Sequence, residues 1–243
     1  MDAQRDNRRI RVISFSGIDG AGKSTQIERL RASLEQIGLS VRLVCFWDDV
    51  ATLTRFREGM AHLVFRGDAG VGTPEAPIRK RDKNVRSWIM TGIRLFLYVA
   101  DTISLRLLIK RVQRSGVDVL IFDRFIYDEL ANLELGQSAM RAYARAITNM
   151  VPKPDISYLL DSDPNEARAR KPEYPLEFLD FNRRSYLTLN NFLGIFQVVA
   201  PMAVDDVERE TLKIALKDLS LAKPLPAPVP NTEGLSPQTS CVP

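Results

Sequence analysis

A glycine-rich turn near the N-terminus carries a lysine and a serine at a spacing that suits phosphate groups. The sequence from Gly17 to Thr25 is G-I-D-G-A-G-K-S-T, and it directly follows the apolar run 10–15. Glycines let the backbone approach an anion closely, and the N–H groups of such a turn and of the following helix point toward it. At this spacing Lys23 reaches the β- and γ-phosphates, and the Ser24 hydroxyl is placed for Mg²⁺. We therefore predict that a nucleoside triphosphate is bound by Gly17, Asp19, Gly20, Ala21, Gly22, Lys23, Ser24 and Thr25.

A second candidate group is the pair Asp123-Arg124, which follows the apolar run 117–122. In open α/β folds, ligands bind at the carboxyl edge of the sheet, where such a strand ends. An aspartate there can hold Mg²⁺ directly or through water, and an arginine can bind a phosphate with two parallel hydrogen bonds. We expect Asp123 to share the metal with Ser24, and Arg124 to contact a phosphate. The alternative is a salt bridge between the two neighbours.

A third candidate is the segment 161–172, which places Arg168, Arg170 and Lys171 within four positions after the expected strand 156–160. Phosphoryl transfer depends on positioning and on neutralising charge, so an arginine-bearing lid that closes over the γ-phosphate fits the chemistry. The alternative is a solvated helix face on which Glu166 pairs with Arg170. The position of the segment directly after a strand favours the lid.

Strands and helices alternate along the chain, which predicts an α/β fold with a parallel sheet flanked by helices. The expected strands are 11–16, 40–46, 117–122, 156–160 and 196–199. The expected helices are 22–37, 50–65, 87–115, 127–150, 175–193 and 205–219.

The domain organisation predicted from composition is simple. We expect one catalytic domain over residues 10–220, a disordered N-terminal tail over 1–9 and a disordered proline-rich tail over 221–243. The segment 66–86 is rich in glycine, proline and charge, which predicts a loop.

The composition of the chain indicates where the protein is located and which kinds of partner it binds. The sequence has only two cysteines, which favours a reducing cytoplasm, and its N-terminus lacks the apolar centre of a signal peptide. The apolar stretch 88–109 contains three charged residues, so we expect a buried helix and no membrane span. The basic cluster 79–83 has no interleaved aromatic residues, so we expect no nucleic-acid partner. A net charge of +4 suits a small anionic substrate.

Taken together, these segments resemble the thymidylate kinase family of P-loop nucleoside monophosphate kinases. The resemblance extends over residues 10–220 and rests on five segments: 15–25, the F-D-R-F sequence at 122–125, 154–161, the arginine-bearing lid, and E-F-L at 177–179 with Arg183 and Tyr186 beyond it.

The resemblance implies a P-loop NTPase fold with a five-stranded parallel sheet and an arginine-bearing lid. It also implies ATP with Mg²⁺ as donor, a nucleoside monophosphate such as dTMP as the small-molecule acceptor beside Arg124, and a homodimer as the usual assembly. Asp19 would face the acceptor sugar, Arg168 and Arg170 would be the catalytic arginines, and adenine would lie near 200–202.

The acceptor side departs from the family pattern at three places. Trp47-Asp48-Asp49 stand where the family usually shows Arg-Glu-Pro-Gly, and Thr102 stands where the base-reading arginine would be. Asp128 takes the place of the usual serine, and Ala-Asn-Leu at 131–133 replaces Ala-Tyr-Gln. Changed hydrogen-bonding groups change the substrate that a site accepts. Arg55, Arg57 or Arg94 could supply the missing phosphate contact.

Two other functions stay open at this point. The chain also resembles deoxynucleoside kinases, in which a carboxylate after the second strand accepts the proton of a sugar hydroxyl, and Asp48 or Asp49 beside Trp47 could fill that role. The third alternative is a regulatory module that binds nucleotide and hydrolyses it without an acceptor. The sequence contains no Asn-Lys-x-Asp guanine-reading motif, which weakens the GTPase version of that alternative.

Overall fold

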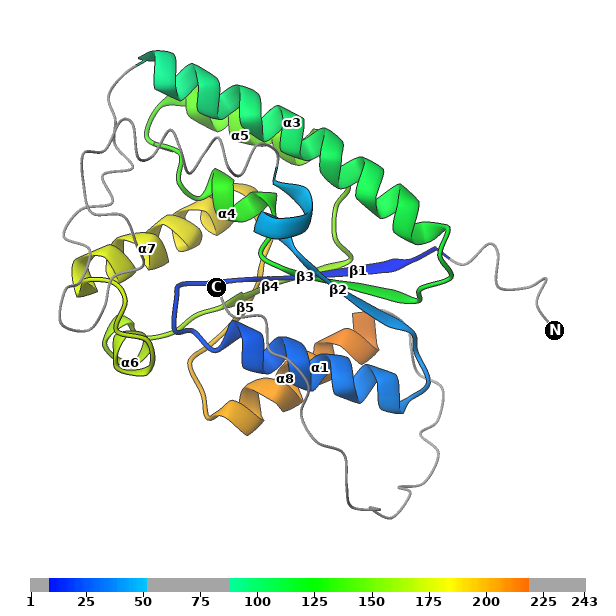
Figure 1. Cartoon of the computed structure of the whole chain (residues 1–243). Helices are drawn as coiled ribbons and strands as arrows, with labels where there is room; N and C mark the ends of the chain where they lie inside the picture. Colours follow the sequence, from blue (N-terminus) through cyan, green and yellow to red (C-terminus); the bar gives the residue numbers. More distant parts are fainter. Residues whose placement is uncertain (1–8, 52–87, 219–243) are drawn as a thin grey trace.

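Five parallel strands form one sheet in the order β2-β3-β1-β4-β5 (Figure 1). A computed structural model describes residues 9–51 and 88–218. The strands are β1 (Arg11–Ser16), β2 (Val41–Cys45), β3 (Val119–Asp123), β4 (Ile156–Leu160) and β5 (Gln197–Val199). All pairings are parallel, so the carboxyl ends of the strands meet at one edge. The predicted α/β class and the five-stranded parallel sheet are confirmed.

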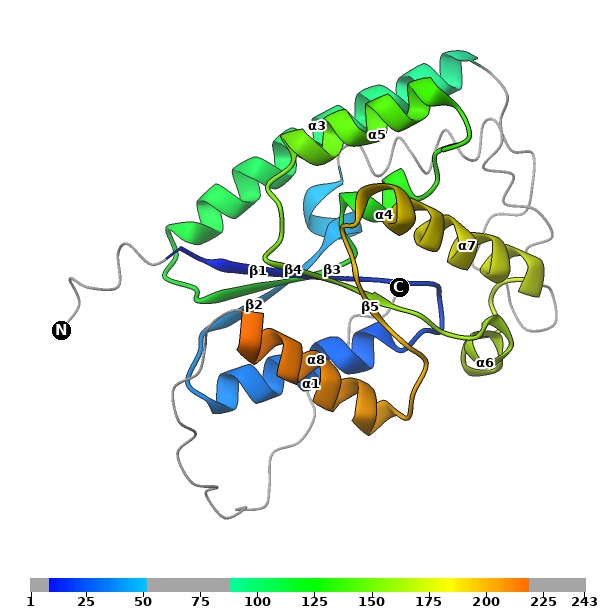
Figure 2. The same cartoon turned by 180° about the vertical axis from the view of Figure 1, so that it is seen from behind.

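Helices cover both faces of this sheet, as Figures 1 and 2 show from opposite sides. One face carries α1 (Lys23–Gln36) and α8 (Val204–Asp218), and the other carries α3 (Trp88–Gln113), α4 (Ile126–Leu130), α5 (Ser138–Met150) and α7 (Leu176–Leu193). The short helix α6 (Pro164–Arg170) lies beside the turn between β1 and α1.

The strands are apolar on both sides because both of their faces are buried, as is usual for parallel sheets. Alternate residues of β1 enter different cores: Val12 packs toward α3 and α7, whereas Ile13 and Phe15 pack toward α1 and α8. Register places Phe15 of β1 and Cys45 of β2 level with Asp123 of β3. The sheet therefore brings the ends of three strands to the same place.

The helix predicted over 127–150 is wrong as one element, because the structure divides it into α4 and α5. The chain between them turns at 131–133, and the Asn132 side chain donates to the carbonyl of Asp128 at 2.9 Å. Leu133 and Leu135 are buried in the core by this turn. The burial of these two leucines thus outweighs the continuous helix that the periodicity of the sequence favours.

A π-helical turn over Phe46–Val50 follows β2, where the sequence predicted the end of a strand and the start of a helix. The predicted helix 50–65 lies almost entirely outside the described residues. The loop 66–86, Arg55 and Arg57, the tail 221–243 and nearly all of the tail 1–9 also lie outside them. Among the helices that the structure describes, none has an apolar stretch long enough to cross a membrane.

Candidate active site

The glycine-rich turn connects β1 to α1 with a backbone that glycine adopts readily. Gly17, Gly20 and Gly22 have φ of 147°, 82° and 86°, in the left-handed half of conformational space. A Cβ built on Gly20 would lie 2.2 Å from the carbonyl oxygen of Ala167, and one on Gly17 would lie 2.7 Å from that of Leu160. The turn is therefore held closely between the end of β4 and the lid helix α6. Ser24 and Thr25 are exposed in the first turn of α1.

Lys23 folds back over this turn. Its Nζ donates to the carbonyl oxygens of Gly17 at 3.0 Å and Ile18 at 2.9 Å, and its side chain is buried. Burial lowers the pKa of Lys23 to about 8, and the positive charge of Arg124 adds to this, against the raising effect of nearby carboxylates. A phosphate anion here would favour the charged form, as expected of a lysine that neutralises charge.

Asp123 ends β3 next to this lysine. Its Oδ1 is buried and accepts no hydrogen bond within the part of the chain that the structure describes. Burial raises the pKa of Asp123 above its ordinary value, and Lys23 and Arg124 act in the opposite direction. A buried carboxylate oxygen without a donor is suited to a cation.

The described residues hold no cluster of three or more metal-ligating side chains. Mg²⁺ usually binds through one or two protein groups plus substrate phosphates and water. The orphaned oxygen of Asp123, with the hydroxyl of Ser24 beside the phosphate loop, therefore fits that kind of site.

Arg124 is held by two carboxylates from other elements. It has a φ of 65°, rare for a residue with a side chain, and its backbone N–H donates to the Phe15 carbonyl at 2.9 Å. Its Nη2 donates to Asp19 at 2.5 Å and its Nη1 to Asp128 at 3.3 Å. The structure thus pairs Arg124 with Asp19 and Asp128, where the alternative had been a salt bridge with the neighbouring Asp123.

The lid helix α6 begins with a well-formed N-terminus. The Asp163 carboxylate accepts from the N–H groups of Asn165 at 2.8 Å and Glu166 at 3.4 Å, and Pro164 occupies the first helical position. Hydrogen bonds to the charged form lower the pKa of Asp163. The cap at Asp163 and the proline after it therefore start α6 shortly after β4 ends.

The two lid arginines differ in their surroundings. Arg170 donates from Nη2 to the Ser162 hydroxyl at 2.7 Å and from Nε to the Glu166 carbonyl at 3.2 Å. Arg168 is exposed and makes no hydrogen bond or ion pair to any residue in the described ranges. Arg170 lies beside the glycine-rich turn, where its Nη1 would be 3.8 Å from a Cβ built on Gly22. Residues two apart on a helix do not share a face, so Arg168 lies on a different side of α6.

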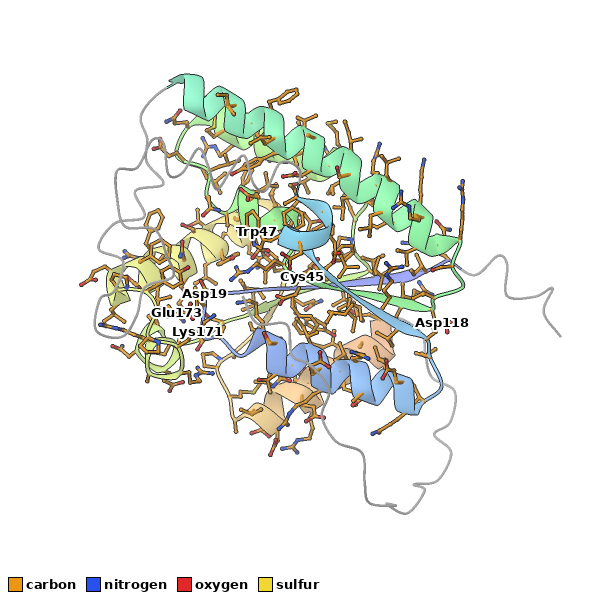
Figure 3. All side chains as sticks on the ribbon, viewed as in Figure 1. Asp19, Cys45, Trp47, Asp118, Lys171 and Glu173 are labelled. Atoms are coloured by element: carbon orange, nitrogen blue, oxygen red, sulfur yellow. The ribbon has the colours of Figure 1, made fainter. Side chains whose placement is uncertain are left out.

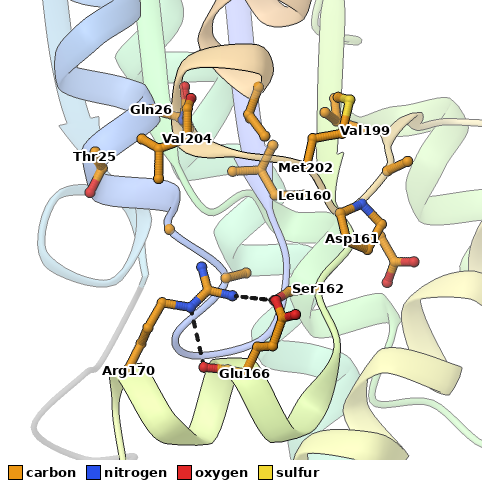
Figure 4. Close-up of a pocket in the computed structure, with 15 residues that line it drawn as sticks. Thr25, Gln26, Leu160, Asp161, Ser162, Glu166, Arg170, Val199, Met202 and Val204 are labelled. Carbon is orange, nitrogen blue, oxygen red and sulfur yellow. Dashed lines mark hydrogen bonds and ion pairs between the residues drawn. The ribbon is translucent and has the colours of Figure 1, made fainter.

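A pocket of about 160 Å³ adjoins the turn (Figure 4). Arg170 and Ser162 lie on one side of it, and Val204 and Gln26 lie on the other. The segment 200–202, where the family resemblance places adenine, lines the pocket together with Gly22 and Thr25. The pocket therefore continues from the phosphate loop toward the predicted base position.

The departures after β2 and in the long helix have structural roles of their own. The Asp49 carboxylate accepts the N–H of Cys45 at 2.9 Å, which closes the π-helical turn. Burial, with the charges of Asp123 and Asp48, raises the pKa of Cys45 to about 12. The Thr102 hydroxyl is buried and donates to the Tyr98 carbonyl within α3.

Figure 3 shows how these groups lie along the sheet. Cys45 and Trp47 mark the end of β2, and Asp19 lies toward the edge where Lys171 and Glu173, which follow α6, are found. Asp118 lies at the opposite end of the strands. The elements that carry the predicted site residues thus gather at the carboxyl edge of the sheet.

Sequence reasoning did not identify Asp128, Tyr186 and Ser16 as one group. Asp128 is buried in α4, and its carboxylate accepts from the hydroxyls of Ser16 at 2.7 Å and Tyr186 at 2.6 Å. The one signal in the sequence was an acidic residue at a position where the resembled family has serine.

The contact between the turn and the lid predicts the effect of Gly20→Ala. A Cβ at residue 20 adds backbone strain and a clash with α6, so we expect lower stability, a lower kcat and a higher KM for ATP. The matched control is Gly38→Ala, where φ is 85° and nothing lies within 4 Å of the new Cβ. Strain alone at Gly38 should lower the free energy of unfolding by about 1 kcal/mol and leave both constants unchanged.

Urea unfolding and steady-state kinetics on the two variants measure this difference. If Gly20→Ala behaves in every respect like Gly38→Ala, α6 does not rest on the turn in solution.

Comparison with known proteins shows the family to which the chain belongs. No family model matches the chain. It is 30% identical over 189 residues to a thymidylate kinase of Bifidobacterium longum, which covers 73% of this chain and 82% of the relative. It is 28% identical over 214 residues to a probable thymidylate kinase of Methanosphaera stadtmanae, covering 86% and 99%. A thymidylate kinase of Maridesulfovibrio salexigens is 29% identical over 222 residues, covering 82% and 91%. The chain, with its glycine-rich turn, strand-end Asp-Arg pair and arginine-bearing helix α6, belongs to the thymidylate kinase family.

Proposed function

We propose that the protein is a nucleoside monophosphate kinase that transfers the γ-phosphoryl group of ATP to dTMP. The observation that carries the proposal is the meeting of Lys23, Asp123 and Arg124 at one sheet edge, beside a glycine-rich turn and a pocket. The names of the relatives support dTMP as the acceptor. The site residues predicted from the sequence are the ones that we assign to this reaction.

The phosphate loop would bind the donor through its N–H groups, and Lys23 would leave its carbonyl partners to neutralise the β- and γ-phosphates. Ser24 and Asp123 would hold Mg²⁺, which supplies charge neutralisation at the transferring group when it is bound. Arg170 already lines the donor pocket, whereas Arg168 would reach the γ-phosphate only through a movement of the lid.

The acceptor would lie on the side of Arg124 and Asp19. An acceptor phosphate is already ionised, so the proposed reaction requires orientation and charge and no general base. This removes the need for Asp48 or Asp49 as a base, and the Asp49 carboxylate already accepts the N–H of Cys45. The names of the relatives likewise favour neither the deoxynucleoside kinase nor the regulatory module.

The decisive experiment measures ADP release from Mg-ATP in the presence of single acceptors. The panel contains dTMP, dUMP, UMP, CMP, AMP, thymidine, deoxycytidine and a control without acceptor. We expect the strongest response to dTMP. A response to a nucleoside alone would instead assign the sugar-hydroxyl reaction, and ADP release that ignores every acceptor would point to the regulatory module.

The lid role predicts a separation of kinetic constants in Arg168→Ala. We expect kcat to fall by about tenfold or more while KM for ATP stays within twofold, because an arginine at the transferring group acts mainly in the transition state. Arg184→Ala is the matched control, since Arg184 is an exposed arginine on α7 that pairs with Asp180. Equal losses in kcat and in ATP binding would argue against the lid role.

Three further expectations belong with this proposal. We propose a catalytic domain over residues 10–220, a homodimer as the assembly and the cytoplasm as the location, on the basis of the composition and the family resemblance. Sedimentation equilibrium of the full chain tests the assembly. A monomer at micromolar concentrations with full activity would contradict the dimer.

A further inference from the structure

Asp128 connects the start of its own helix α4 to two segments that are distant in sequence. Its Oδ2 accepts from the Ser16 hydroxyl at 2.7 Å and from the Phe125 N–H at 3.1 Å. Its Oδ1 accepts from the Tyr186 hydroxyl at 2.6 Å and from Arg124 Nη1 at 3.3 Å. A single buried carboxylate therefore joins the end of β1, the turn after β3, α4 and α7.

All four partners can donate, so the group at residue 128 must accept at both oxygens. An ionised carboxylate does this, whereas an asparagine amide would present a donor to other donors and a serine hydroxyl would reach fewer partners. Burial and the Asp128 charge raise the pKa of Tyr186 well above its ordinary value, which keeps the phenol protonated as a donor. Of these three side chains, only aspartate accepts from all four donors.

The same contacts determine where the guanidinium of Arg124 lies. Asp128 on α4 accepts from Nη1, and Asp19 in the glycine-rich turn accepts from Nη2. The left-handed backbone of Arg124 is a conformation that persists only where the surroundings impose it. Two carboxylates and the Phe15 carbonyl supply that constraint.

We infer that Asp128 is a positioning residue for the acceptor side: it holds Arg124 in place and couples it to α7 through Tyr186. The inference rests on the proposed function, in which Arg124 contacts the acceptor phosphate. Asp128 does not itself touch the reacting groups. It replaces the serine expected from the family resemblance, so this chain positions its acceptor arginine by an ionic contact of its own.

Kinetics of Asp128→Asn and Asp128→Ser test the inference. Release of Arg124 should raise KM for dTMP by about tenfold and leave KM for ATP within twofold, because a charge-assisted hydrogen bond is lost on the acceptor side only. Tyr186→Phe removes one donor and keeps the ring, so it should raise the same constant by a smaller factor.

The matched control is Asp155→Asn. Asp155 is a comparable carboxylate at the other end of the sheet, where it accepts from the Val12 N–H at 2.8 Å and pairs with Arg9 at 3.2 Å and Arg11 at 3.5 Å. This variant should lower the melting temperature and leave both KM values unchanged. If Asp128→Asn instead raises both KM values equally, or neither, Asp128 is merely structural. Should the Asp128 variants fail to fold, Tyr186→Phe decides between the same outcomes.

A readout independent of turnover separates this inference from the proposed function. Guanidinium signals in nitrogen-edited NMR spectra of the ligand-free protein should show restricted rotation for Arg124, with the signal assigned by its loss in Arg124→Lys. The restriction should disappear in Asp128→Asn and persist in Asp155→Asn. Persistence in Asp128→Asn would overturn the inference, whatever the acceptor panel reveals. A wild-type protein with restricted Arg124 and no response to dTMP would overturn the proposed function alone.

Discussion

Lys23→Met should lower kcat on the order of 10²–10³-fold, the usual cost of removing one donor from a preorganised anion site. The methionine keeps the apolar stem of the side chain and removes the ammonium group, which lies at the glycine-rich turn. Steady-state ADP release with Mg-ATP and dTMP measures the loss. Lys213→Met, at an exposed lysine on α8, should leave kcat unchanged. A folded Lys23→Met protein with normal turnover would contradict the site assignment.

The same variant should be as stable as the wild type without ligand, or more stable. Burial lowers the pKa of Lys23 from 10.5 to about 8, so the folded state disfavours the charged form. Between these two values the unfolded chain binds more protons than the folded one. The free energy of unfolding should therefore rise with pH from about 8 to 10.5 by up to about 1.4 kcal/mol per pH unit.

Urea unfolding of the ligand-free wild type and of Lys23→Met across this pH range isolates the contribution of the lysine. The difference between the two curves should change only where Lys23 titrates, since other groups are common to both proteins. A difference that stays constant from pH 7 to 11 would show that the lysine is not desolvated in solution.

Asp123→Asn should lower kcat by about 100-fold and raise the Mg²⁺ concentration needed for half-maximal activity, because a neutral amide holds the cation more weakly. The ligand-free variant should melt at a higher temperature than the wild type. Burial raises the pKa of Asp123, so the charged carboxylate destabilises the folded state above that pKa, and the amide relieves the penalty.

Thermal unfolding with and without Mg-ATP checks both halves of this prediction. The wild type should gain more in melting temperature from Mg-ATP than Asp123→Asn does. The control is Asp118→Asn: its carboxylate accepts the Ser40 N–H at 2.9 Å at the opposite end of the sheet, so kinetics should be unaffected. An Asp123→Asn enzyme with wild-type Mg²⁺ dependence would exclude Asp123 from the metal site.

The donor side was predictable because its signals are local. Nine consecutive residues make the phosphate loop, and the backbone conformations that it requires are ones that glycine adopts, as the positive φ at Gly17, Gly20 and Gly22 confirms. The sequence signal for the end of α1 is local in the same way. Gly38 has a φ of 85°, and the N–H groups of Gly38 and Leu39 bond to the carbonyls of Glu35 and Leu34, which closes the helix.

The acceptor side was less predictable because its contacts are long-range. Ser16 and Asp128 are 112 positions apart, and Tyr186 lies 58 positions beyond Asp128. No periodicity of the chain reports such a contact. The break between α4 and α5 has a similar origin, because the burial of Leu133 and Leu135 decides it.

From the sequence alone, the five strands, the glycine-rich turn and the strand-end pair Asp123-Arg124 could be derived, since each depends on neighbouring residues or on a short repeat. Only the tertiary structure decided that Arg124 pairs with Asp19 and Asp128 and that Arg170 bonds to Ser162 beside the turn. It also decided that Asp123 has a buried oxygen without a donor among the described residues. The physical reason is that burial and charge pairing are properties of residues brought together by folding, and these energies are not encoded in the local sequence.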